Sequence, residues 1–216
     1  MAAERTSSTP SKYHLKGKAA GGAASSGSPG DGKAAKVKAS GLEAAARKLN
    51  PLLKRVSRSF HLTLRVLPEA IRTQIGLAYL LARATDTVAD TELISWQERL
   101  ITLRMLRDRI LGTHGFPLEF EELAGQQGDE AERELLLRIE EAVEALALLS
   151  PKDQERIREV ITTIVSGQEI DLERFGQATA EQVVALQTHA GLEDYTYRVA
   201  GCVGVFWTRM VQAHLF

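Results

Sequence analysis

Apolar positions recur at spacings of three and four residues from Gly41 onward, with almost no strand-like alternation. This period is typical of amphipathic helices. The pattern predicts helices over 42–55 with an interruption near Pro51, and over 58–66, 68–91, 95–111, 130–149, 151–175 and 180–214, with a loop at 112–129. The chain is therefore predicted to be an all-α bundle.

Residues that favour helix ends agree with these boundaries. Ser95 and Ser150 precede two of the helices and are of the type that caps helix N-termini. Pro68 and Pro151 suit a first helical turn, where no backbone N–H is needed. Gly112 follows another helix and suits a helix C-terminus.

The first forty residues differ from the rest of the chain. They hold seven Lys and Arg against two Asp and Glu, which leaves 20 against 26 in the remainder, so a segment of charge +5 precedes a body of charge −6. Few large apolar groups are present to offset the entropy of ordering. We predict a disordered basic segment at 1–40 and a folded helical domain at 41–216. The lysines could make peripheral contact with an anionic membrane surface or with nucleic acid, although a solvated extension is the simpler interpretation.

Composition limits the class of protein. The 216 residues are 44% hydrophobic and 25% charged, which is the balance of a soluble globular protein. The single cysteine, Cys202, can form no intrachain disulfide, so a cytoplasmic protein is expected, with at most membrane association. We also expect a monomer. No apolar run approaches the roughly 20 residues that span a bilayer. The acidic body and its sparse aromatic residues argue against nucleic acid as a partner.

A pair of aspartates interrupts an otherwise apolar helix pattern. Asp86 and Asp90 are four residues apart, which places them on one helical face with Cβ atoms roughly 6 Å apart. Like charges this close repel, and hard oxygen ligands at this spacing suit Mg²⁺ that is shared with substrate phosphates. Arg83, one turn earlier, could bind a carboxylate or phosphate oxygen. A helix end that turns polar where it meets solvent is the alternative interpretation.

Two hydroxyls flank an arginine at Ser57, Arg58 and Ser59. At a helix start, this group could offer backbone N–H groups, hydroxyls and a guanidinium to one anion, as phosphate pockets do. An ordinary N-cap is the alternative.

Further along, Gly201 and Gly204 lie inside a predicted helix, where each costs about 1 kcal/mol relative to Ala. They would let a long apolar ligand or, alternatively, a neighbouring helix approach the backbone closely.

Four segments in order carry a family resemblance: VSRSFHLTLRVLP at 56–68, IGLAYLLARATDTVADT at 75–91, GQEIDLERF at 167–175 and DYTYRVAGCVG at 194–204. Together they resemble the squalene/phytoene synthase family of head-to-head prenyl transferases. The resemblance runs from about Pro51 to the C-terminus. It implies an all-α class I isoprenoid synthase bundle around a deep apolar cavity.

The resemblance also implies a reaction. Mg²⁺-assisted loss of diphosphate from one allylic prenyl diphosphate is followed by attack of the double bond of a second. Two farnesyl diphosphates would give presqualene diphosphate and then squalene, with NADPH as reductant. A phytoene or dehydrosqualene synthase is the alternative within the family.

Site roles follow from the same resemblance. Tyr195, Asp86 and Asp90 would be catalytic, and Asp86 and Asp90 would bind metal, with Asp171 as a further candidate ligand. The diphosphate would contact Ser57, Arg58, Ser59, Arg83 and Tyr79. The substrate tunnel would be lined by Phe60, Val199, Ala200, Gly201 and Gly204.

Two departures from the family pattern stand out. Ala89 occupies a position where many members carry a third carboxylate, and no aspartate follows Asp194, so the second aspartate-rich motif is absent from this chain. We therefore expect an N-terminal part of a squalene synthase-like enzyme, incomplete at its C-terminus and inactive on its own. A catalytically inactive helical assembly module is the alternative from a different class.

Overall fold

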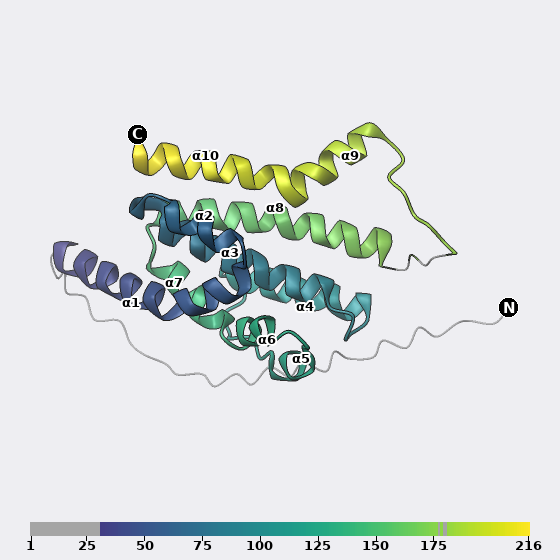
Figure 1. Ribbon diagram of the computed structural model, residues 1–216, viewed down its shortest axis with the longest axis horizontal. Coiled ribbons are helices and arrows are strands. Elements are labelled where there is room, and N and C mark those ends of the chain that lie inside the picture. The colour runs from purple at the N-terminus through teal and green to yellow at the C-terminus, as the bar shows by residue number, and fades with distance from the viewer. Residues whose placement is uncertain (1–30, 177, 179–180) are drawn as a thin grey trace.

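The computed structural model describes residues 31–176, 178 and 181–216, and every regular element among them is a helix (Figure 1). The elements are α1 (Asp31–Ser57), α2 (Phe60–Val66), α3 (Glu69–Asp90), α4 (Trp96–Leu111), α5 (Glu121–Gln126), α6 (Glu130–Leu137), α7 (Ile139–Leu148), α8 (Pro151–Phe175), α9 (His189–Thr196), the π-helical η1 (Tyr197–Gly201) and α10 (Cys202–Leu215). The predicted all-α class is confirmed.

Helix α3 is the centre of the bundle. Buried residues occupy most of its length, and Leu81, Ala84 and Val88 have no exposed surface. A helix that is apolar nearly all round must be covered on several sides. α4, α7 and α8 supply that cover, and α10 lies along α8 on the outer side (Figure 1).

The first helix begins earlier than predicted. α1 starts at Asp31 and so includes residues 31–40, which belong to the segment predicted to be disordered, while 1–30 lie outside the described residues. Ala and Lys dominate this stretch, and their helix propensity extends a helix that is already nucleated downstream. α1 also runs through Pro51 without the predicted interruption. The buried side chains of Leu49 and Leu52 anchor the helix on both sides of this exposed proline.

Two other boundaries differ from the prediction. The predicted helix 130–149 divides at Arg138, which leaves helical geometry with φ −114° and ψ 12°. Its guanidinium holds Glu134 on one side of the break and Glu141 on the other. The predicted loop 112–129 contains α5, a short helix that buries Leu123.

The last predicted helix begins later than residue 180. Residues 181–188 are not helical, and α9 starts after Thr188, whose hydroxyl accepts a hydrogen bond from the Gly191 N–H. Four of the five signals at other helix ends are confirmed. Ser95 forms a capping box and Ser150 accepts from the Asp153 N–H, with Pro151 in the first turn. Gly112 ends α4 with φ 81°, whereas Pro68 precedes α3 rather than opening it.

The close approach of two segments occurs at a glycine of α8. A Cβ added at Gly167 would lie 2.9 Å from the Arg198 Cβ and 3.3 Å from the Val199 Cγ1, so η1 packs directly against the α8 backbone. At Gly204, by contrast, an added Cβ would meet nothing within 4 Å. In the described part of the chain, no helix is long and apolar enough to cross a membrane.

Candidate functional site

The aspartate pair lies on the last two turns of α3, facing α6 and α8. Asp86 Oδ1 accepts a 2.6 Å hydrogen bond from Gln168 Nε2 of α8, and the nearest guanidinium nitrogen of Arg83 lies 3.9 Å from Asp86 Oδ2. Burial, and then the charge of Asp90, raises the pKa of Asp86 to about 6. The carboxylate is therefore charged at neutral pH, but its surroundings favour the protonated form.

Asp90 stands at the surface end of this group. Partial removal from water raises the pKa of Asp90, Arg83 opposes the change, and the charges of Asp171 and Glu132 add to it. Both aspartates therefore share an excess of negative charge. A divalent cation would relieve it.

The donor set fits Mg²⁺ that is shared with a phosphate. Mg²⁺ is commonly bound through one or two carboxylates together with substrate phosphates and water. Among the described residues, no three His, Cys, Asp or Glu side chains are arranged to hold a metal, so Asp171 does not complete a cluster with Asp86 and Asp90. Gln168 Oε1 is buried and has no hydrogen-bond partner, so it could accept from a metal-bound water. Gln168 gave no signal at the sequence level, because its role depends on the register of α8 against α3.

Two other predicted site residues contact each other. The Tyr195 hydroxyl of α9 donates a 3.2 Å hydrogen bond to Asp171 Oδ1 of α8. Burial, together with the charge of Asp171, raises the pKa of the Tyr195 hydroxyl. The proton therefore stays on the tyrosine, with its position set by the carboxylate.

The serine–arginine segment forms the turn between α1 and α2. Arg58 has φ 47°, a left-handed conformation that a side chain other than glycine seldom adopts. Its side chain is exposed, and so is Ser59, which makes no capping hydrogen bond. Ser57 is buried and donates its hydroxyl to the Leu53 carbonyl at 2.5 Å. The expected phosphate contact is thus open to Arg58 and Ser59, while the Ser57 hydroxyl is held by its own helix, since α1 continues to that residue.

Aromatic side chains join this turn to the rest of the bundle. The rings of Phe60 and Tyr79 stack with centroids 5.0 Å apart, and Trp207 of α10 lies 6.1 Å from Phe60. The Tyr79 hydroxyl donates to the Val56 carbonyl at 3.4 Å, and burial raises the pKa of that hydroxyl. Phe60 and Tyr79 thus form an apolar wall beside the serine–arginine turn.

The arginines at this site are paired with acids that the sequence reasoning missed. Arg83 contacts Glu132 of α6, and Arg58 Nη2 lies 3.4 Å from Asp129 Oδ2, just before α6. The acidic residues at the start of the predicted helix 130–149 were visible in the sequence as possible partners for arginines. That this helix end faces α3 could not be predicted from the sequence.

The other expected tunnel residues lie at the surface. Val199, Ala200, Gly201 and Gly204 are all exposed, with Val199 at 40%. In this structure they form an open face of η1 and α10 and do not enclose a tunnel. Their role in substrate binding stays a prediction.

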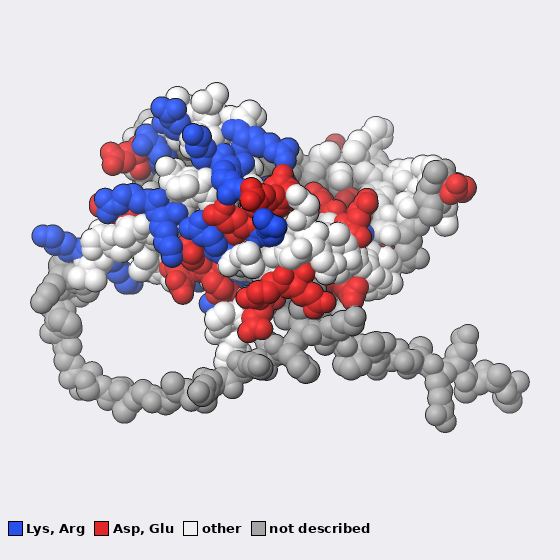
Figure 2. Space-filling model, turned by 60° about the horizontal axis from the view of Figure 1, so that its bottom comes forward, with Lys and Arg blue, Asp and Glu red and all other residues white. Residues whose placement is uncertain are grey.

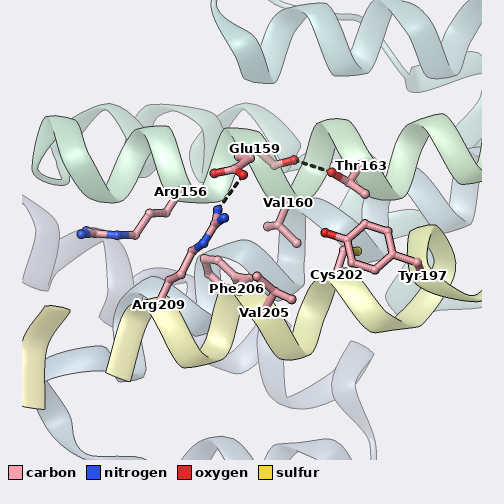
Figure 3. Close-up of a pocket in the computed structure, with 9 residues that line it drawn as sticks. All are labelled: Arg156, Glu159, Val160, Thr163, Tyr197, Cys202, Val205, Phe206 and Arg209. Carbon is pink, nitrogen blue, oxygen red and sulfur yellow. Dashed lines mark hydrogen bonds and ion pairs between the residues drawn. The ribbon is translucent and has the colours of Figure 1, made fainter. Parts of the chain in front are cut away.

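A separate small pocket lies between α8 and α10 (Figure 3). Val160, Cys202 and Phe206 are among its lining residues. Its arginines are already paired, since Arg209 Nη1 lies 2.6 Å from Glu159 Oε1 and Arg156 binds Asp153. This pocket contains none of the predicted catalytic or metal-binding residues.

Comparison with known proteins gives a consistent result. The squalene/phytoene synthase family model matches residues 53–214. The chain belongs to the squalene/phytoene synthase family. Its relatives include squalene synthase ERG9 of Saccharomyces cerevisiae, 28% identical over 167 residues, and squalene synthase BSS of Botryococcus braunii, 29% identical over 161 residues.

A solved structure shares the fold. The complex of TcSQS with the ligand E5700 superposes with a TM-score of 0.62 at 27% identity, over 77% of this chain and 44% of that one. The two sequence relatives are matched over 74% and 71% of this chain. The chain spans 34% of the length of the yeast protein and 30% of the algal one. It therefore contains the family's helical fold over part of its relatives' length.

Proposed function

We propose that this chain provides the first metal and diphosphate site of a head-to-head prenyl transferase. The observation that carries the proposal is the meeting of α3 and α8 at Asp86: Asp90 follows it and Arg83 lies beside it on α3, and Gln168 of α8 binds it. Membership of the squalene/phytoene synthase family supports the reaction class.

The side chains would act on the diphosphate as follows. Asp86 and Asp90 would hold Mg²⁺, which when bound neutralises charge on the departing diphosphate. Arg83 and Arg58 would donate N–H groups to phosphate oxygens. The proton on Tyr195, oriented by Asp171, would be available to the leaving group.

The organic part of the substrate needs protection from water. The stacked rings of Phe60 and Tyr79 offer π-faces that stabilise positive charge and an apolar surface that excludes water. We propose two farnesyl diphosphates as substrates, with presqualene diphosphate and squalene as products and NADPH as the reductant. Phytoene or dehydrosqualene synthesis is the second candidate, and product analysis with C15 and C20 diphosphates would decide between them.

The first test is binding. We expect farnesyl diphosphate to bind the 216-residue chain only with Mg²⁺ present, and Asp86→Ala or Asp90→Ala to weaken binding about tenfold or more, since each removes a metal ligand. Isothermal titration calorimetry measures both. Glu122→Gln, an exposed change on α5, serves as the control. Metal-independent binding, or wild-type affinity in the aspartate variants, would contradict the site.

Turnover is the second test. This chain has no aspartate after Asp194, so it lacks a second aspartate-rich motif to hold metal from the opposite side. We expect no squalene or presqualene diphosphate when the chain is incubated with farnesyl diphosphate, Mg²⁺ and NADPH. Detection of either product by mass spectrometry would show that the motif is dispensable.

A further inference from the structure

Both arginines of the proposed diphosphate site are held by one short acidic segment. Arg58 pairs with Asp129 and Arg83 pairs with Glu132, and we call residues 129–132, at the start of α6, the acidic turn. The two arginines come from different elements, α3 and the turn between α1 and α2. A single segment therefore contacts one guanidinium nitrogen of each of the two arginines that a diphosphate would need.

Backbone hydrogen bonds and partial burial stabilise the acidic turn. Asp129 Oδ1 accepts hydrogen bonds from the N–H groups of Ala131 at 2.8 Å and of Glu132 at 3.1 Å, which makes Asp129 the N-cap of α6. These backbone hydrogen bonds, that of Glu132 first, lower the pKa of Asp129. The side chains of Arg83 and Glu132 are only 26% and 21% exposed, so solvent screens their attraction less than at an open surface.

The same acids also face the metal-binding pair. The charge of Glu132 raises the pKa of both Asp86 and Asp90, so Glu132 interacts electrostatically with both proposed metal ligands. Arg58 and Arg83 contribute two positive charges, against four negative charges from Asp86, Asp90, Asp129 and Glu132. On the face in Figure 2, acidic side chains likewise border the basic ones directly. A site with a negative balance repels a free, multiply charged diphosphate.

We propose that Asp129 and Glu132 determine the specificity of the site for metal-complexed diphosphate. They hold the N–H donors of Arg58 and Arg83 until a diphosphate arrives with its divalent cation, and they exclude diphosphate without metal. The cation offsets the local negative balance and lets phosphate oxygens replace the two carboxylates on the arginines. This inference rests on the proposed function of the Asp86 and Asp90 site.

Conservative variants test the proposal with inorganic pyrophosphate as the probe. Glu132→Gln and Asp129→Asn each remove one negative charge, and Asn keeps the ability to cap α6. By isothermal titration calorimetry in EDTA, we expect the wild type to show no binding. Each variant should bind metal-free pyrophosphate at least about tenfold more tightly than the wild-type limit, as loss of one nearby charge implies.

A matched control removes the same charge elsewhere. Glu122 is exposed on α5, and Glu122→Gln should keep wild-type selectivity for the magnesium complex. Circular dichroism checks that every variant is folded.

Each outcome bears on one claim. Binding of magnesium pyrophosphate by the wild type, with unchanged selectivity in both acidic-turn variants, overturns the inference alone. Weaker binding of the magnesium complex by Glu132→Gln, without any metal-free binding, also overturns it and would make Glu132 a metal ligand. If neither the wild type nor any variant binds magnesium pyrophosphate, the proposed function fails, and the inference fails with it.

Discussion

The raised pKa of Asp86 links the candidate site to the stability of the protein. Its carboxyl has a pKa of about 6 in the folded chain, against 3.8 for an ordinary aspartate. The folded state therefore holds the proton more tightly than the unfolded state. This contribution to stability is complete below about pH 4 and is lost as the pH rises through about 6.

Asp86→Asn should remove this pH dependence. The side chain is 42% exposed, so solvent reduces the effect of the pKa shift, and we expect the variant to be more stable than the wild type by on the order of 1 kcal/mol at pH 7 without divalent metal. Urea denaturation at pH 4, 5, 6 and 7 measures the difference. If the free energies of unfolding of the two proteins change in parallel with pH, Asp86 is not the group responsible for the pH dependence of stability.

At the residue scale, the sequence was informative where a role depends on neighbours along one helix. The spacing of Asp86 and Asp90 placed them on one face, and the structure agrees. Roles that depend on another helix could not be predicted. The Gln168 side chain reaches Asp86 only because α8 packs against α3 in a particular register.

At the element scale, two helical glycines differ in their packing. Gly167 lies where η1 touches α8, whereas Gly204 faces open space on α10. The helix propensity of the two sites is similar, so packing decides the effect of an added methyl group.

The pair makes a matched test. Gly167→Ala should lower the free energy of unfolding by about 1–3 kcal/mol, because the new Cβ clashes with Arg198 and Val199. Gly204→Ala should raise it by up to about 1 kcal/mol through helix propensity. Urea denaturation compares both with the wild type. A stabilising Gly167→Ala would mean that η1 moves away at little cost.

Helix ends could be predicted where the signal is local. Ser95 and Ser150 cap their own helices with hydrogen bonds to residues three positions later. The break at Arg138 could not be predicted from propensity, because Glu134, Glu141 and the Lys48 carbonyl together hold its guanidinium. Lys48 comes from α1, which is distant in sequence.

At the scale of the whole molecule, a buried carboxylate joins α10 to the start of α8. Asp153 is 3% exposed, and His214 Nε2 and Arg156 Nη1 each lie 2.9 Å from its Oδ1. Burial alone would raise the pKa of Asp153, but the hydrogen bonds from His214, Ser150 and Arg156 lower it. The lowered pKa of Asp153 therefore contributes stability above about pH 4, and this contribution is lost as the pH falls below that value.

His214→Ala should loosen α10. With one partner of a buried carboxylate removed, the free energy of unfolding at pH 7 should fall by about 1–3 kcal/mol, and amide hydrogen exchange in α10 should speed up. Gln212→Ala, an exposed neighbour, is the control and should change neither. Equal exchange rates in the two variants would show that α10 is held by its apolar contacts alone.

The order of the four motifs was enough to predict the bundle, since each motif lies in or next to a helix that packs at α3 or α8. The contacts of the acidic turn were not predictable, because Arg83 and Glu132 are 49 residues apart and meet only after α5 and α6 have folded back. The metal-binding carboxylates and the arginines could be identified from the sequence, but the acids that pair with the arginines could not.

Helix α8 also determines the distance between the two halves of the candidate site. Gln168, which binds Asp86, and Asp171, which binds Tyr195, are three residues apart, so about 4.5 Å of helix rise separates the metal side from the tyrosine side. Insertions in the segment 177–188 leave this interval unchanged. One residue inserted between Gln168 and Asp171 would rotate the Asp171 side chain by about 100° around the helix axis relative to Gln168, so the geometry for a departing leaving group depends on the residue count of a single helical turn.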